Sequence, residues 1–236
     1  MATSDARPIL ERRILIITCF ITLLAFIFYI VSITTDYWAI IDTPNGVNTS
    51  GMFILGAHLG IWRFCYWESN VPTGSLFETD DKLCRYVHLF TSAEDVMKNS
   101  EEVDTQTMDM NRSAAAFSII GLGLILLGHL FAVYSLNQLR FMYKRVTGCI
   151  HIMCALCIIL INEIMINNVI RRVDELARFA DSELVWGYSI YLSWVAFAVF
   201  LAAGIVFFLC SKKRKGEHAF SEEEALENEP IHLGRI

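Results

Sequence analysis

The sequence predicts an integral membrane protein: a left-handed bundle of four transmembrane helices with a small antiparallel extracellular β-sheet. Three observations support this fold class. The 236 residues are 55% hydrophobic, which is more than is usual for a soluble domain. Four apolar runs are each long enough to cross about 30 Å of hydrocarbon. A single long polar segment separates the first run from the second.

The long polar segment carries Cys65, Cys84 and the sequon that begins at Asn48. Disulfides persist, and asparagines are glycosylated, in oxidising compartments. We therefore place this segment outside the cell and expect Asn48 to be glycosylated. A Cys65–Cys84 bridge would stabilise so small a domain by about 3 kcal/mol in the chain-entropy model. The other five cysteines lie within or at the end of apolar runs, and we expect them to be free thiols.

The apolar runs and the charges between them divide the chain into nine segments. Basic residues gather in the loop 137–145 and directly after the fourth run, so the positive-inside rule places both sites, and both termini, in the cytoplasm. The first run is too long for a signal peptide and is expected to be an uncleaved span. The segments are an N-terminus (1–13), the first span (14–34), extracellular loop 1 with the sheet and disulfide (35–113), the second span (114–136), a cytoplasmic loop (137–145), the third span (146–169), extracellular loop 2 (170–185), the fourth span (186–210) and a disordered cytoplasmic tail (211–236).

Two spans carry candidate partner contacts. In the second span, Gly128 and Ala132 are four residues apart and allow helices to approach closely. They would pack within the bundle or, alternatively, against a partner. In the third span, Glu163, Asn167 and Arg171 fall on one helical face. This polar stripe would either cap the outer end of the bundle and brace the sheet or meet a polar face of a partner's membrane domain.

No chemistry-bearing motif assembles in the sequence. There is no nucleophile elbow, HExxH motif or phosphate loop, so we do not expect an enzyme. His129, His151, Cys154 and Cys157 have a spacing that could suit a soft metal. Cysteines in membrane helices instead pack as small hydrophobes, and histidines there bond across helices, so we expect no metal or cofactor. No basic patch with interleaved aromatics indicates nucleic acid binding. Ser221, before three acidic residues, is a candidate phosphorylation site.

Trp38, the triplet Gly60-Ile61-Trp62, Cys65 and Cys84 resemble the W…GLW…C…C signature of the claudin and peripheral myelin protein superfamily. The resemblance implies a claudin-like arrangement of the predicted bundle and sheet. Further motifs resemble the voltage-gated calcium channel γ subunits, and the skeletal-muscle type more than the synaptic type. These motifs lie at 34–39, 58–65, 113–116 and 185–198.

The resemblance implies an auxiliary subunit of the plasma membrane. Such a subunit binds beside a voltage-sensing domain of the pore-forming α1 subunit, together with the other auxiliary subunits, and modulates gating. The synaptic relatives imply an alternative, regulation of AMPA-type glutamate receptor trafficking and gating through binding to receptor subunits. A third alternative is claudin-like adhesion or barrier formation at cell junctions, which a glycan at Asn48 would crowd.

Overall fold

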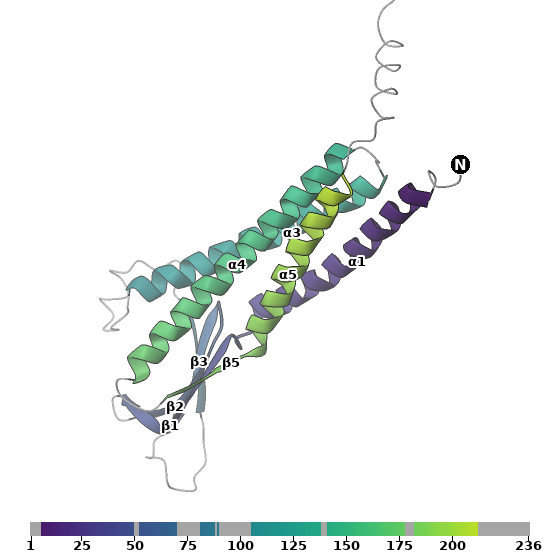
Figure 1. Ribbon diagram of the computed structural model, residues 1–236. Coiled ribbons are helices and arrows are strands. Elements are labelled where there is room, and N and C mark those ends of the chain that lie inside the picture. The colour runs from purple at the N-terminus through teal and green to yellow at the C-terminus, as the bar shows by residue number, and fades with distance from the viewer. Residues whose placement is uncertain are drawn as a thin grey trace, which may run out of the picture.

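The structure is a computed structural model that describes residues 6–49, 52–69, 81–87, 89, 105–137, 141–177 and 182–211. Within these residues, four helices are long and apolar enough to cross a membrane. They run side by side, and a sheet lies at one end of the bundle (Figure 1). The claudin-like fold predicted from the sequence is thereby confirmed. The helices are α1 (Ala6–Thr34), α3 (Thr105–Asn137), α4 (Phe141–Ala177) and α5 (Tyr188–Leu209).

On the side of the sheet, two helices extend well beyond the apolar spans predicted from the sequence. At the end that carries the sheet, α3 begins at Thr105 rather than 114, and α4 continues to Ala177 rather than 169. Apolar composition sets how much of a helix can lie in hydrocarbon, whereas backbone hydrogen bonding sets where the helix ends. The polar residues assigned to loops therefore continue two of the helices out of the membrane and toward the sheet.

The sheet has five antiparallel strands in the order β4-β3-β2-β1-β5. Strands β1 to β4 come from the long polar segment, but β5 lies in the predicted second extracellular loop and pairs with β1, Ile40 opposite Val185. This loop thus completes the sheet instead of standing apart from it. The strands are β1 (Ala39–Thr49), β2 (Met52–Leu59), β3 (Arg63–Ser69), β4 (Asp81–Tyr86) and β5 (Glu183–Trp186).

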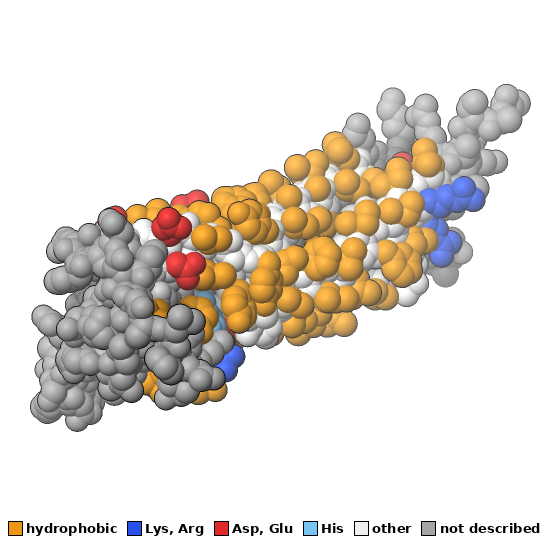
Figure 2. Space-filling view, turned by 90° about the horizontal axis from the view of Figure 1, so that it is seen from below, with side chains coloured by type: hydrophobic (Ala, Val, Ile, Leu, Met, Phe, Trp, Pro, Cys, Tyr) orange, Lys and Arg blue, Asp and Glu red, His pale blue; other side chains and the backbone are white. Residues whose placement is uncertain are grey.

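The bundle forms a closed ring in which α1 contacts α3 and α5, and α4 contacts the same two helices. Its apolar core includes Tyr29, Ile125, Ile158 and Phe200, all fully buried. Around this core the outer surface is a broad apolar belt. Acidic side chains gather near the end with the sheet, and Lys and Arg mostly at the opposite end (Figure 2). This pattern is that of a protein that spans a membrane.

Buried polar groups also join the helices. Ser193 of α5 donates to Asn162 Oδ1 of α4 over 2.5 Å, and Asn168 of α4 donates to Asn111 Oδ1 of α3 over 2.5 Å. Hydrogen bonds between helices are a main source of specificity where lipid offers no hydrophobic driving force. These pairs set the register of α4 against both of its neighbours.

Candidate functional site

The signature tryptophans bind the end of the first helix. The last carbonyls of a helix have no partner within the helix. Trp38 Nε1 donates to the carbonyl of Ser32 over 3.0 Å, and Trp62 Nε1 donates to that of Ile33 over 2.6 Å. Trp38 is almost fully buried. The two indoles therefore cap α1 from the sheet side and fix the sheet on the bundle.

The triplet Gly60-Ile61-Trp62 forms the turn between β2 and β3. Gly60 N donates to the carbonyl of Arg63 over 2.9 Å and closes the turn. A Cβ on Gly60 would lie 2.6 Å from Asp36 Cα. Only glycine lets this turn pass so close to the backbone after α1, and this is the physical reason for glycine in the signature.

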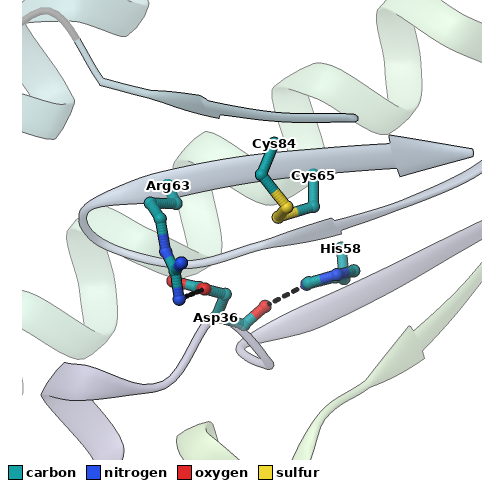
Figure 3. Close-up of a disulfide and its surroundings, with 5 residues drawn as sticks. All are labelled: Asp36, His58, Arg63, Cys65 and Cys84. Atoms are coloured by element: carbon teal, nitrogen blue, oxygen red, sulfur yellow. Dashed lines mark hydrogen bonds and ion pairs between the residues drawn. A yellow bond between two sulfur atoms is a disulfide. The ribbon is translucent and has the colours of Figure 1, made fainter. Parts of the chain in front are cut away.

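Asp36 is the charged centre of this region, with a side chain that is 6% exposed. Its carboxylate pairs with the Arg63 guanidinium, Nη2 to Oδ2 at 2.5 Å, and its backbone carbonyl accepts from His58 Nδ1 at 2.8 Å (Figure 3). The hydrogen bond and the charge of Asp36 raise the pKa of Arg63 above its ordinary value. Oδ2 of the carboxylate makes this internal pair, which tethers the β2–β3 turn to the end of α1.

The predicted disulfide joins Cys65 of β3 to Cys84 of β4 beside this turn (Figure 3). The two residues are directly opposite each other in the antiparallel register. The five cysteines predicted to be free, Cys19, Cys149, Cys154, Cys157 and Cys210, are unpaired. In the part of the chain that the structure describes, no three His, Cys, Asp or Glu side chains are grouped to hold a metal ion. The histidines of the candidate soft-metal set, His129 and His151, instead each bond the carbonyl four residues earlier.

The start of α5 docks on the same region. Gly187 N donates to the carbonyl of Trp38, and Ser189 N to that of Tyr37. A Cβ on Gly187 would lie 1.9 Å from the Tyr37 carbonyl oxygen, so a glycine is required here as well. Ser32 Oγ of α1 donates to the carbonyl of Ser189. The sheet-side ends of α1 and α5, the sheet and the disulfide therefore form one interlocked layer.

The small residues of the second span lie inside the bundle. Gly128 is buried, and a Cβ there would lie 3.2 Å from His151. Ala132 is 1% exposed and belongs to an apolar cluster with Leu15 and Phe207. The sequence allowed these residues to pack within the bundle or against a partner. The structure has them packed within the bundle, where α3 approaches α4 and the other helices. Neither position is exposed on the surface of the bundle.

Unlike Gly128 and Ala132, Glu163 and Asn167 lie on the outside of the bundle. Both are exposed on the outer face of α4, and Asn167 Nδ2 donates to the backbone carbonyl of Glu163 over 2.7 Å. Their role as a partner contact stays a prediction, and within the described residues neither of these two side chains contacts the sheet. Arg172 does so instead, since its guanidinium lies 4.9 Å from the centre of the Phe64 ring of β3.

The sequence predicts modification at Asn48 and Ser221, whereas a second sequon, at Asn111, lies too near the predicted second span to be modified. Asn48 lies in β1, and its backbone is opposite Phe53 in the sheet. Ser221 lies outside the described residues. The Asn111 side chain is 5% exposed and bonded to Asn168 between two helices. A glycan on Asn111 is incompatible with this packing.

Sequence reasoning missed the buried polar links. Asn162 and Asn168 flank the predicted stripe yet point the other way, toward α5 and α3. The Asp36–Arg63 pair was also missed, because 27 residues separate its members. One usable signal was present: two asparagines within an apolar run are costly in lipid and therefore indicate helix–helix contacts.

Comparison with known proteins agrees with this architecture. Residues 23–209 match the family model described as PMP-22/EMP/MP20/Claudin tight junction. The bovine voltage-dependent calcium channel gamma-1 subunit is 29% identical over 218 residues, which cover 89% of this chain and 93% of that protein. The human gamma-1 subunit is 27% identical over 227 residues, which cover 92% of this chain and 96% of that protein. The mouse gamma-6 subunit is 27% identical over 46% of this chain and 43% of its own length.

The match spans the signature tryptophan, the β2–β3 turn, the disulfide and all four helices, and the gamma-1 relatives extend over nearly the whole chain. The expectation that this is not an enzyme agrees with the family, whose members are structural and auxiliary membrane proteins. The chain therefore belongs to the PMP-22/EMP/MP20/claudin family and, as its motifs predicted, resembles the calcium channel gamma subunits of the skeletal-muscle type within it.

Proposed function

We propose that this protein is an auxiliary subunit of a voltage-gated calcium channel. It binds the pore-forming α1 subunit laterally in the plasma membrane, beside a voltage-sensing domain, and modulates gating. The observation that carries the proposal is the likeness to gamma-1 subunits over about nine-tenths of the chain. The structure supports it with a polar pair on the outer face of a membrane-spanning helix, Glu163 and Asn167.

The topology that this function requires has both termini in the cytoplasm. Lys144 and Arg145 lie at the start of α4 and reach the end of α5, where they bond the Cys210 carbonyl and Ser211 Oγ. The first described residues of α1 lie at the same end of the bundle, away from the sheet (Figure 1). Basic residues favour the cytoplasmic side, so the disulfide-bearing sheet faces outward in this proposal.

The mechanism is stoichiometric binding without catalysis. A subunit that binds one gating state of a channel more tightly than another shifts the equilibrium toward that state. A difference of only about 1.4 kcal/mol in binding moves this equilibrium tenfold. The outer face of α4 can supply such a difference, because a carboxylate held within a membrane gains more from a polar partner than from lipid.

The test replaces Glu163 and Asn167 together with leucine and records currents from the co-expressed channel. We expect the gating shift to disappear while surface expression persists. The matched control is Asp109→Leu with Ser113→Leu on α3, because this exposed pair has the same spacing and the same bond from the later side chain to the earlier carbonyl. If the Glu163/Asn167 variant shifts gating as much as the wild type does, these two residues do not contact the channel as proposed.

A pull-down from native membranes in mild detergent tests the partner itself. Recovery of an α1 chain, with its other auxiliary subunits, supports the proposal. Recovery of glutamate receptor subunits, or of junction scaffolds without a channel, overturns it in favour of receptor regulation or claudin-like adhesion.

A further inference from the structure

The exposed face of α4 is a narrow stripe. Because α3 and α5 cover its two sides, side chains are left exposed at alternating steps of three and four residues. In the part of α4 between 153 and 170, these residues are Met153, Leu156, Leu160, Glu163, Asn167 and Ile170. Steps of three and four are the spacing of a coiled-coil seam, in which each side chain can enter a hole on one facing helix. We call these six residues the α4 seam.

The seam is apolar except near its outer end. Met153, Leu156, Leu160 and Ile170 are between 43% and 50% exposed, while Glu163 and Asn167 occupy two successive seam positions. A polar residue at one seam position specifies the register of a partner helix. The acid therefore selects one partner and one register, which a uniformly apolar stripe would not do.

The depth of Glu163 follows from its neighbour. Asn162 is bonded to Ser193, five residues after the start of α5, or about 8 Å along the helix. Exposed Tyr191 and Trp194 lie at this level of α5, and such aromatics gather where hydrocarbon meets the head groups. Glu163 thus lies in the outer part of the membrane, below the sheet.

A carboxylate at this depth favours a cationic counterpart. Within the described residues, no hydrogen bond or ion pair engages the Glu163 carboxylate; the Asn167 amide bonds only to the Glu163 backbone carbonyl. Charged side chains inside membranes usually face a protein partner and pair with one another. A charge-assisted bond to a guanidinium or ammonium is also stronger than one to a neutral donor.

We propose that the α4 seam binds one transmembrane helix that carries an arginine or lysine in its outer third, opposite Glu163. This inference rests on the proposed function and identifies the chemistry of the partner there. In a voltage-gated channel, the sensor helix is rich in arginine. Pairing Glu163 with an outer arginine would favour the position of the sensor in which that arginine faces the seam.

The first experiment places a photo-crosslinking amino acid at Leu160 of the full chain, co-expressed with the α1 subunit. The control position is Leu126 on α3, which is similarly exposed at 50% but outside the seam. We expect a covalent adduct with α1 from position 160 and none from position 126. Adduct peptides should map to one transmembrane segment that contains an arginine or lysine. An adduct only from position 126, or one that maps to a segment without a basic residue, overturns the proposal.

The second experiment separates charge from polarity. Glu163→Gln keeps the size and hydrogen-bonding groups of the side chain, and Glu163→Asp keeps its charge. We expect Glu163→Gln to lower the amount of co-purified channel about tenfold, within the usual range of coupling between sites, and Glu163→Asp to retain most of it. Equal recovery with Glu163→Gln and wild type overturns the cationic counterpart. Failure of the wild-type chain itself to co-purify with α1 would instead overturn the proposed function.

Discussion

Asp36, next to the sheet, and Glu163, on the outer face of α4, are two carboxylates in opposite environments. Asp36 is buried, paired with Arg63 and covered by a glycine turn, so its charge is spent on holding the sheet against α1. Glu163 is exposed on α4 and has no cationic partner among the described residues. A charge satisfied internally serves stability, whereas one presented to the membrane from a rigid helix is available for recognition. The comparison predicts that changes in the first region alter folding and changes in the second alter binding.

Gly60→Ala is expected to lower stability more than the changes at Arg63, Trp62 and Glu163 that follow. The added methyl group would lie 2.6 Å from both Asp36 Cα and Oδ1, where backbone cannot give way cheaply. We expect the free energy of unfolding to fall by about 3 kcal/mol, the upper part of the range for overpacking. Melting in mild detergent measures the effect. Gly123→Ala is the control, since no atom lies within 4 Å of its Cβ position; equal melting of both variants would break the comparison.

A smaller loss is expected from Arg63→Met. It leaves the buried Asp36 carboxylate without its cation, and removing one partner of a buried pair is strongly destabilising. Because the Arg63 side chain is 40% exposed, solvent screening reduces the expected loss to about 2 kcal/mol. Adding Asp36→Asn should recover part of it, as a double-mutant cycle monitored by melting would show. Additive losses from the two substitutions would mean that the pair does not couple.

Trp62→Phe isolates one cap of α1. The aromatic ring stays, but the donor to the Ile33 carbonyl is lost. We expect a loss of about 1 kcal/mol, the usual net worth of one hydrogen bond. Protection of the last turn of α1 against hydrogen exchange should fall, and that of α4 should not. An unchanged exchange rate in α1 would show that the cap contributes nothing.

The smallest effect on stability is expected from Glu163→Leu. The side chain is exposed and bonds nothing across the bundle among the described residues, so melting should change by less than about 0.5 kcal/mol. Channel binding should fall with this same variant. A large loss of melting temperature would show that Glu163 serves the fold and would remove the contrast with Asp36.

The sequence alone determined the number of spans, the disulfide and the family motifs, because each depends on local composition or short spacing. The length of an apolar run decides whether a helix can span, and two cysteines outside such runs have few alternative partners. Even so, local composition does not show that Gly60-Ile61-Trp62 turns the chain against Asp36, because the two segments are remote in sequence.

Tertiary structure alone decided which side of each helix faces inward. The sequence left open whether Gly128 and Ala132 serve packing or a partner, and only the assembled bundle places them inside. Asn162 and Glu163 are adjacent in the chain, yet one bonds α5 and the other faces outward. An isolated helix has no inside in lipid, since apolar residues are favourable on every face. The partners of each helix assign its faces, and they are known only once the bundle is assembled.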